Sequence, residues 1–208
     1  NAMDAVLPTF AERVIGVEGR DRVGRFNAVN SVLILVLAPL VGVLTRKRAA
    51  YSMVILGGFV TAASFAFMAL PARMFSGLAN GWLGDAVGHG YLGLEGTVHP
   101  YIVMIVLWQV AFSIGEAIYS PRVYEYAASI APKGQEASFA SLSYIPLLMG
   151  KLATGALFGG ILERYCPANG PRDPGGMWTI VGILVLAAPV ALLLLARFIR
   201  VKEEGREG

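Results

Sequence analysis

The sequence predicts an all-α membrane protein, and three observations support this fold class: composition, long apolar runs and internal prolines. Hydrophobic residues make up 56% of the 208 residues and charged residues only 15%, which is more apolar and less charged than an ordinary soluble domain. Lipid offers no water to the backbone, so an apolar run of about 20 residues crosses a bilayer as a helix. Pro39, Pro146 and Pro189 lie inside three such runs, where membrane helices tolerate proline, and we interpret them as kinks.

Five stretches have the length and composition of full membrane spans. They are preceded by segment 3–16, which is apolar in patches but only about 21 Å long as a helix. Because this is too short to cross a bilayer, we interpret it as a truncated first helix, which implies that the intact protein is longer. The predicted full spans are Phe26–Leu44, Tyr51–Leu70, Tyr101–Tyr119, Phe139–Leu162 and Met177–Ala196.

The predicted spans form one transmembrane domain over residues 1–208, built from two units of three helices. Counting the truncated helix, the units cover 3–70 and 101–199, and a glycine-rich extracytoplasmic loop at 71–100 joins them. A charged cytoplasmic tail follows at 200–208. Secondary transporters are commonly built from three-helix units of inverted topology, so this arrangement fits a six-helix half-bundle of such a transporter.

Basic residues orient the spans in the membrane. Arg46, Lys47 and Arg48 follow the first full span, and further lysines and arginines follow the last one. By alternation both groups lie on one side, and cytoplasmic loops carry the excess of basic residues. The arginines of the opposite loops are interleaved with acidic residues. We therefore expect an integral protein of the plasma (inner) membrane with a cytoplasmic C-terminus.

Several function classes are not expected from this sequence. A net charge of +3 with scattered basic residues lacks the basic face that nucleic-acid binding requires. The single cysteine, Cys166, cannot form an internal disulfide, and no Cys/His cluster has metal-ligand spacing. A literal G-x-G-x-x-G at 88–93 lies between two spans and predicts a loop, since dinucleotide sites need it between a strand and a helix. We expect no cofactor, no metal and, without hydrolase or nucleotide-binding signatures, no enzyme.

Two charged residues lie where a membrane-embedded chain tolerates them least. Glu116 is inside the run 101–119 and Lys151 is inside the run 139–162. An ionised side chain at the bilayer centre costs at least about 2.5 kcal/mol, so such residues usually face a protein interior or a water-filled path. Glu116 could instead form a structural ion pair with Arg122. Lys151 could bind an anionic substrate group, pair with Glu116 as a gate, or extend toward the membrane surface.

Two asparagines share one face near the outer end of the first full span. Asn27 and Asn30 are three residues apart, a spacing that places side chains together on a helix. Asn27 suits a helix N-cap. Asn30 lies one turn further in, where an amide either caps the helix or lines a polar path. Asn30 is therefore a candidate site residue.

The region around Glu116 resembles a known transporter family. The segment from Gly115 to Pro121, the Ala-Pro loop at 130–134 and the following span with Lys151 resemble the tenth and eleventh helices of the major facilitator superfamily. The proton-dependent oligopeptide transporter branch is the most similar. Residues 4–8 resemble the outer end of the seventh helix, whereas the segment 42–48 keeps the glycine and basic residues of the superfamily's loop signature but has no aspartate.

The resemblance implies that the chain is the C-terminal half of a transporter, from a truncated seventh helix to the twelfth. It implies a lipid bilayer and a missing N-terminal six-helix half as partners. It also implies that Glu116 lines a central cavity and engages the amino end of a substrate. Tyr119 and Arg122 belong to the same helix segment and complete the candidate substrate-binding or proton-coupling set with Glu116, Lys151 and Asn30.

Two functions of different class follow from these features. The first is a proton-coupled secondary transporter of a small-solute or peptide-like substrate, working by alternating access. The alternative is a non-transporting membrane scaffold or accessory subunit, in which Glu116 and Lys151 only hold helices together. An enzyme acting within the membrane is less favoured, because no nucleophile–base pair or metal-ligand set is present.

Overall fold

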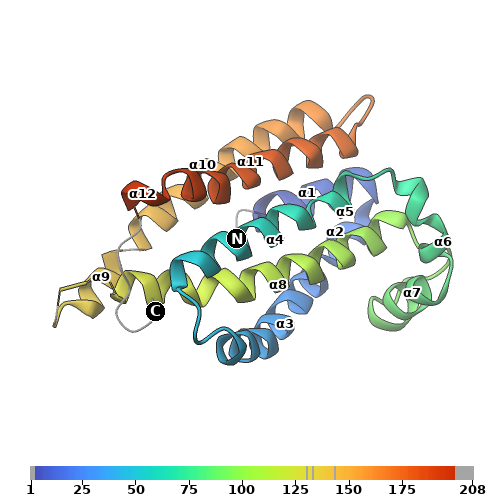
Figure 1. The fold of residues 1–208 in the computed structure, drawn as a ribbon. Coiled ribbons are helices and arrows are strands. Elements are labelled where there is room, and N and C mark those ends of the chain that lie inside the picture. The colour runs from blue at the N-terminus through green and yellow to red at the C-terminus, as the bar shows by residue number, and fades with distance from the viewer. Residues whose placement is uncertain (1–2, 130, 133, 143, 200–208) are drawn as a thin grey trace.

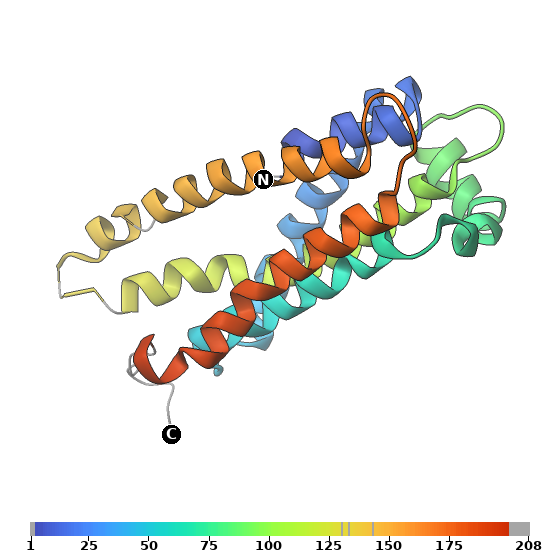
Figure 2. The same cartoon turned by 90° about the horizontal axis from the view of Figure 1, so that it is seen from above.

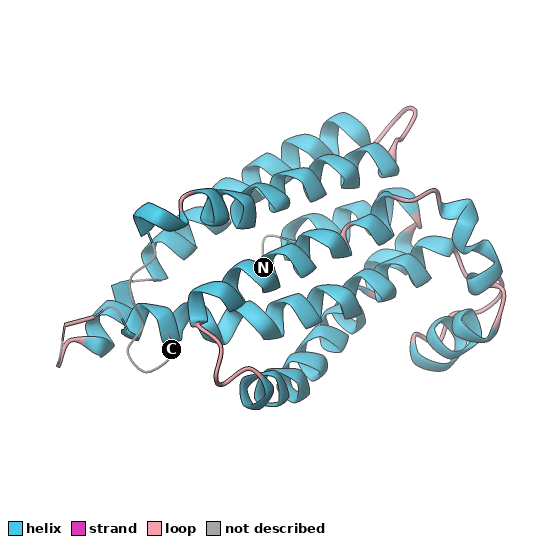
Figure 3. Cartoon of the chain, viewed as in Figure 1, coloured by secondary structure: helices cyan, strands magenta, loops and turns pink. Residues whose placement is uncertain are grey.

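The computed structural model describes residues 3–129, 131–132, 134–142 and 144–199, and helices account for most of them (Figure 1). Within these ranges the chain forms no strand, so the predicted all-α class is confirmed (Figure 3). The longer helices are α1 (Met3–Val14), α3 (Val23–Leu44), α4 (Ala50–Ser64), α8 (Pro100–Ser129), α10 (Tyr144–Tyr165) and α11 (Pro174–Leu194). The shorter ones are α2 (Val17–Asp21), α5 (Ala66–Ala69), η1 (Ala72–Phe75), α6 (Ser76–Ala79), α7 (Trp82–Gly84), η2 (Asp85–Tyr91), α9 (Glu136–Leu142) and α12 (Ala196–Ile199).

Four helical stretches among the described residues are long and apolar enough to cross a membrane. They are Val17–Leu44, Ala50–Ala69, Pro100–Ala127 and Pro174–Leu194. These stretches contain α3, α4 with α5, most of α8, and α11. They fit the membrane-protein class predicted from composition, and each overlaps one of the predicted spans.

The predicted count of five full spans is not supported. The expected span 139–162 covers the end of α9 and most of α10, and Ser143 between them lies outside the described residues. Helix α10 also carries Lys151 near its middle and Glu163 and Arg164 in its last turn. These charges make it less apolar than the four stretches above. The predicted tail at 200–208 lies outside the described residues as well.

Helix α8 is the axis of the structure, with α4 packed on one side and α3 on another (Figure 1). Helix α11 packs on α4 and α5, away from α3, and α10 packs on α1 and α11 (Figure 2). The short helix α1 is not a full span, as predicted from its length, but its inner face is buried: Leu7, Phe10 and Ala11 are at most 1% exposed. This short first helix is thus part of the core.

Two glycines bring the backbones of α4 and α8 into direct contact. A Cβ atom added at Gly115 would lie 2.2 Å from Thr61 Oγ1, and one added at Gly57 would lie 2.8 Å from the carbonyl oxygen of Gly115. No side chain larger than hydrogen fits at either position. Small residues that allow such close approach are a usual basis of helix packing in membranes, where water does not drive helices together.

An aromatic cluster joins α1, α8 and α11 at one end of the bundle. The ring of Phe10 lies 5.0 Å from that of Trp178, and Trp108 lies 6.1 Å from Trp178. Phe65, between α4 and α5, stacks on Trp178 at 6.0 Å. Edge-to-face and offset ring pairs at these distances each add about 0.5–1.5 kcal/mol beyond area burial. The cluster therefore fixes the relative positions of helices that are distant in sequence.

The segment 71–100, expected as a loop, folds into short helices. It contains η1, α6, α7 and the π-helix η2, and these pack against α8 (Figure 1). Phe75, Leu92 and Val98 supply buried apolar side chains. Glycine-rich composition favoured a loop, but these buried side chains join the main hydrophobic core and so hold the segment in place.

The α4–α8 contact predicts that Gly115→Ala destabilises the protein. The added methyl group must displace Thr61, and over-packing of this kind costs about 1–3 kcal/mol. Gly159→Ala on α10 is the matched control, because no atom lies within 4 Å of a Cβ there. Thermal unfolding in detergent should show a lower midpoint for the first variant and an unchanged or raised midpoint for the second. A Gly115→Ala midpoint equal to that of the wild type would contradict the backbone contact.

Candidate functional site

Glu116 faces α3 because its neighbour Gly115 faces α4. Successive residues on a helix point about 100° apart, so the α4–α8 contact at Gly115 turns the next side chain toward a different neighbour. Glu116 Oε2 accepts a hydrogen bond from Asn30 Nδ2 at 3.1 Å. Asn30 lies on α3, and the bond therefore joins two membrane-length helices. The structure brings together these two residues of the predicted site.

Ser113 completes this polar contact and fixes the orientation of the amide. Its hydroxyl oxygen lies 2.6 Å from Asn30 Oδ1 and 2.7 Å from the carbonyl oxygen of Gln109. One hydroxyl proton serves these two acceptors. With its oxygen toward Ser113, the amide presents its NH₂ group to Glu116. We call Asn30, Ser113 and Glu116 the α3–α8 polar site.

The site continues along one face of α8. Gln109, Ser113 and Glu116 follow spacings of four and three residues, which place their side chains on one face of a helix. Ser113 is fully buried, Gln109 is 3% exposed, and Glu116 and Asn30 are half-buried. Gln109 Oε1 is buried without a hydrogen-bond partner among the described residues. The polar face thus leads from the half-exposed carboxylate into the protein.

Ser113 and Gln109 were not predicted from the sequence. Serine is common in membrane helices as a small packing residue, and neither side chain carries a charge that marks it as costly to bury. The available signal was their spacing relative to Glu116. A polar residue one turn before an intramembrane carboxylate lies on the same face as that carboxylate.

Arg122 lies near the site but has a different partner. It is only 4% exposed, and its guanidinium forms an ion pair with Glu125 rather than with Glu116. Arg122 Nη2 also donates to Thr45 Oγ1 at 2.7 Å and to the carbonyl oxygen of Gly42 at 3.5 Å. The last carbonyls of a helix lack partners within that helix, and cations there are favourable. Arg122 therefore anchors the C-terminal end of α3 to α8.

Lys151 does not join the polar site, and Tyr119 lies close enough to interact electrostatically with Glu116 but forms no hydrogen bond with the described residues of the site. Lys151 is exposed on α10, and its side chain forms no ion pair or hydrogen bond with another described residue, although its carbonyl oxygen accepts a bond from Thr154 Oγ1 at 3.3 Å. The gate in which Lys151 pairs with Glu116 is thus not formed in this structure. Tyr119 is half-buried one turn beyond Glu116, and its Cβ lies against α4 at Gly57.

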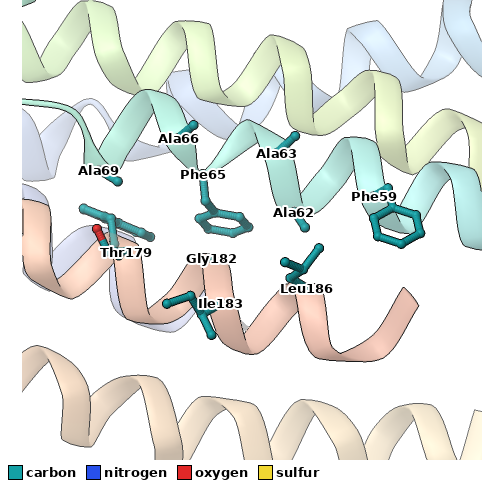
Figure 4. A pocket seen from close by; sticks show the side chains of 11 residues that line it. Phe59, Ala62, Ala63, Phe65, Ala66, Ala69, Thr179, Gly182, Ile183 and Leu186 are labelled. Carbon is teal, nitrogen blue, oxygen red and sulfur yellow. The ribbon is translucent and has the colours of Figure 1, made fainter. Parts of the chain in front are cut away.

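An apolar groove lies on the other side of α4. Its volume is about 500 Å³, and it runs between α4–α5 and α11 (Figure 4). Alanines and large apolar side chains line it, and its one hydroxyl, on Thr179, already donates to the carbonyl oxygen of Gly175. None of the predicted site residues lines the groove. It offers no set of polar groups that could orient a hydrophilic solute.

Cysteine and metal chemistry find no support at the described positions. Burial raises the pKa of the Cys166 thiol to about 11, so the thiol is protonated and a weak nucleophile at neutral pH. The residues that the structure describes contain no group of three His, Cys, Asp or Glu side chains that could hold a metal ion.

Comparisons of the chain with protein-family models, with curated proteins and with solved structures find no match. The resemblance to the major facilitator superfamily therefore rests on the sequence segments described above, and it stays a prediction.

The Asn30–Glu116 bond predicts that Asn30→Asp is destabilising in a pH-dependent way. The substitution places a second carboxylate within about 3 Å of the first, and two like charges so close cannot both ionise without cost. Asn27→Asp, three residues earlier on α3, is the control, since the Asn27 side chain makes no hydrogen bond with another described residue.

Thermal unfolding midpoints at pH 8 and pH 5 test this expectation. Asn30→Asp should unfold several degrees below the wild type at pH 8 and recover part of the loss at pH 5, because a proton then relieves the repulsion. Asn27→Asp should follow the wild type at both pH values. A pH-independent loss in Asn30→Asp would show that Glu116 does not face Asn30.

Proposed function

We propose that the chain is the C-terminal half of a proton-coupled secondary transporter that carries a small-solute or peptide-like substrate by alternating access. The observation that carries this proposal is the half-buried Glu116 on a membrane-length helix, held by the neutral Asn30 of a second one. No lysine or arginine among the described residues neutralises it. An intramembrane carboxylate without a cation is a candidate for binding protons or substrate.

Protonation of Glu116 would couple proton movement to a conformational change. A charged carboxylate resists removal from water, whereas the neutral acid is far less costly to bury. The protonated state therefore favours a closed state in which Glu116 is shielded from water, and the ionised state favours one in which it is open to water. Asn30 can donate to Glu116 in either state, because both forms keep an acceptor oxygen. A cationic group of a substrate would replace the proton as the neutralising charge.

A second six-helix half is proposed as the partner of this chain. The outward face of α3 exposes large apolar side chains. In the most apolar stretch of 18 residues within Val17–Leu44, no residue is buried. This surface suits lipid along part of its width and another helical bundle along the rest. The exposed side chains are Val32, Leu35, Val36, Leu40, Val43 and Leu44. In the proposed half-bundle of major-facilitator type, the substrate path lies between the two halves, beside Glu116.

The proposed location is the plasma (inner) membrane with the C-terminus in the cytoplasm. Arg46, Lys47 and Arg48 directly follow α3, and such clusters favour the cytoplasmic side. The anchor from Arg122 to Thr45 lies at this same end of α3. By the same orientation, the short helices of 71–100 are on the outer side.

A scaffold or accessory subunit is the alternative function. It is favoured by the contacts of Arg122, which join α3 to α8 through Thr45 and involve no free charge. The Asn30–Glu116 bond could serve the same purpose. In that case neutral substitutions at Glu116 would alter stability and have no transport activity to alter.

Glu116→Gln in the full-length protein distinguishes the two functions. The amide keeps the shape and an acceptor oxygen for Asn30 but cannot bind a proton. We expect proton-driven uptake into proteoliposomes to be abolished and substrate exchange, which needs no net proton movement, to be partly retained. Glu163→Gln, an exposed carboxylate on α10 paired with Arg13, is the control and should transport normally.

Equal loss of uptake and exchange in Glu116→Gln, with normal folding, would count against a coupling role. Absence of transport by the wild type across peptide, amino-acid, sugar and drug panels would favour the scaffold.

Lys151 is proposed to bind an anionic group of the substrate. No described residue would lose a partner on its substitution, so Lys151→Gln should leave the thermal unfolding midpoint unchanged. We expect a higher KM for substrates that carry a carboxylate and an unchanged KM for substrates that lack one. Uptake kinetics with matched acid and amide substrates measure this difference, and equal KM changes for both would exclude the role.

A further inference from the structure

Residues 85–98, which we call the outer cap, form a compact unit beside α3 and α8. The amide of Leu94 donates to the carbonyl oxygen of Gly88 at 2.9 Å, and Leu92 and Val98 are buried. Gly88 packs so closely on Val98 that an added Cβ would lie 2.4 Å from Val98 Cγ2. The cap includes the π-helix η2, a rare conformation found frequently at functional sites.

Arg25 of α3 ties the cap to the helix that carries Asn30. Its Nη1 donates to the carbonyl oxygens of Tyr91 and Leu92 at 2.9 and 2.7 Å. The Tyr91 hydroxyl donates in return to the carbonyl oxygen of Arg25 at 2.9 Å. Arg22 adds a longer bond, 3.4 Å, to the carbonyl oxygen of Gly93. A change in the cap is therefore transmitted directly to the first turns of α3.

His89 closes the cap with both of its ring nitrogens. Nδ1 lies 3.1 Å from Asp85 Oδ1, and Nε2 lies 2.7 Å from the carbonyl oxygen of Gly96. Both partners are acceptors. A neutral imidazole carries only one N–H, whereas the imidazolium carries two. The observed geometry is thus satisfied in full only when His89 is protonated.

We propose that the outer cap is a proton-sensitive clamp on α3, closed when His89 bridges Asp85 and Gly96 as an imidazolium and loosened when it becomes neutral. On deprotonation one of the two bonds loses its proton. Loss of the Nε2 bond releases the turn at Gly96, which lies at φ 81°. That turn leads back to the buried Val98 and to the start of α8.

The direction of the pH effect follows from the same contacts. The carbonyl oxygen of Gly96 and the carboxylate of Asp85 raise the pKa of His89, although burial opposes them. A group whose pKa is raised in the folded state stabilises that state fully below its ordinary pKa, about 6.5 for histidine. The contribution disappears as pH rises through the raised value. The cap should be tight at mildly acidic pH and loose at alkaline pH.

The other charged groups near the cap do not share this titration. Arg22 and Arg25 on α3 keep their charge at all relevant pH values. Glu95 is the remaining acidic residue within the cap. Burial lowers the pKa of His99, and its Nδ1 accepts a bond from the amide of Tyr101 at 3.2 Å, so His99 is neutral where His89 changes charge.

The link from this clamp to transport rests on the proposed function and orientation, whereas the clamp itself does not. On the proposed orientation the cap faces the outer side, from which coupled protons enter. A protonated clamp would then hold the outer end of α3 in place when external protons are abundant. The test is accordingly a structural measurement that needs no transport activity.

Hydrogen exchange of the peptide amides of residues 85–98, measured on the full chain in nanodiscs between pH 5 and 8.5, tests the clamp. With intrinsic exchange rates corrected for pH, we expect wild-type protection to fall as pH rises, with a midpoint above 6.5. His89→Gln should show low protection at every pH. His99→Gln, the only other histidine of the chain, is the matched control and should keep the wild-type transition.

A second measurement uses the wild type and therefore does not depend on how well a variant folds. The ring nitrogens of His89 in the wild type, titrated by NMR, should show the same midpoint as the exchange transition. Asp85→Asn should lower both midpoints together. A pH-independent protection, a transition abolished by His99→Gln, or a His89 midpoint below 6.5 would each overturn the proposal. If the exchange and NMR results are as expected but the Glu116→Gln uptake experiment contradicts its prediction, the proposed transport function is refuted and the clamp is not.

Discussion

The direct contact between the α4 and α8 backbones at Gly57 and Gly115 is the constraint on which the candidate site depends. A helix in lipid has no hydrophobic effect to fix its rotation about its own axis, so close packing has to do so. Two glycines that admit no side chain hold α8 in one orientation. Glu116, one residue further on, must then point toward α3, where Asn30 meets it.

Polar contacts between α3 and α8 act on this fixed frame and differ in kind. At one end Arg122 is buried and fully engaged by Glu125 and Thr45, a structural arrangement that leaves no charge free for chemistry. Nearer the middle of the helices, Glu116 has only a neutral amide as partner and stays half-exposed. At the N-terminal end Arg25 joins α3 to the cap. The same helix is thus anchored at both ends and carries a titratable contact between them.

Much of this organisation could be predicted from the sequence, because a bilayer imposes simple rules. Run length predicted the all-α class, the cost of burying a charge singled out Glu116, and a position one turn inside the span selected Asn30. Sequence alone could not show that Arg122 prefers Glu125 or that Lys151 stays apart on α10. Those outcomes depend on how helices rotate and pack. Ser113 and the folded cap were missed because uncharged polar residues and glycines carry no comparable cost that marks them.

Infrared difference spectroscopy of the full-length protein in membranes tests the central claim most directly, since it detects protonation of a single carboxyl group. The account predicts a carboxylic C=O band that appears on acidification, is absent in Glu116→Gln, and shifts in Asn30→Ala, which removes the hydrogen bond to the carboxyl group. A band that persists in Glu116→Gln, or one that Asn30→Ala leaves unchanged, would contradict a titrating Glu116 held by α3.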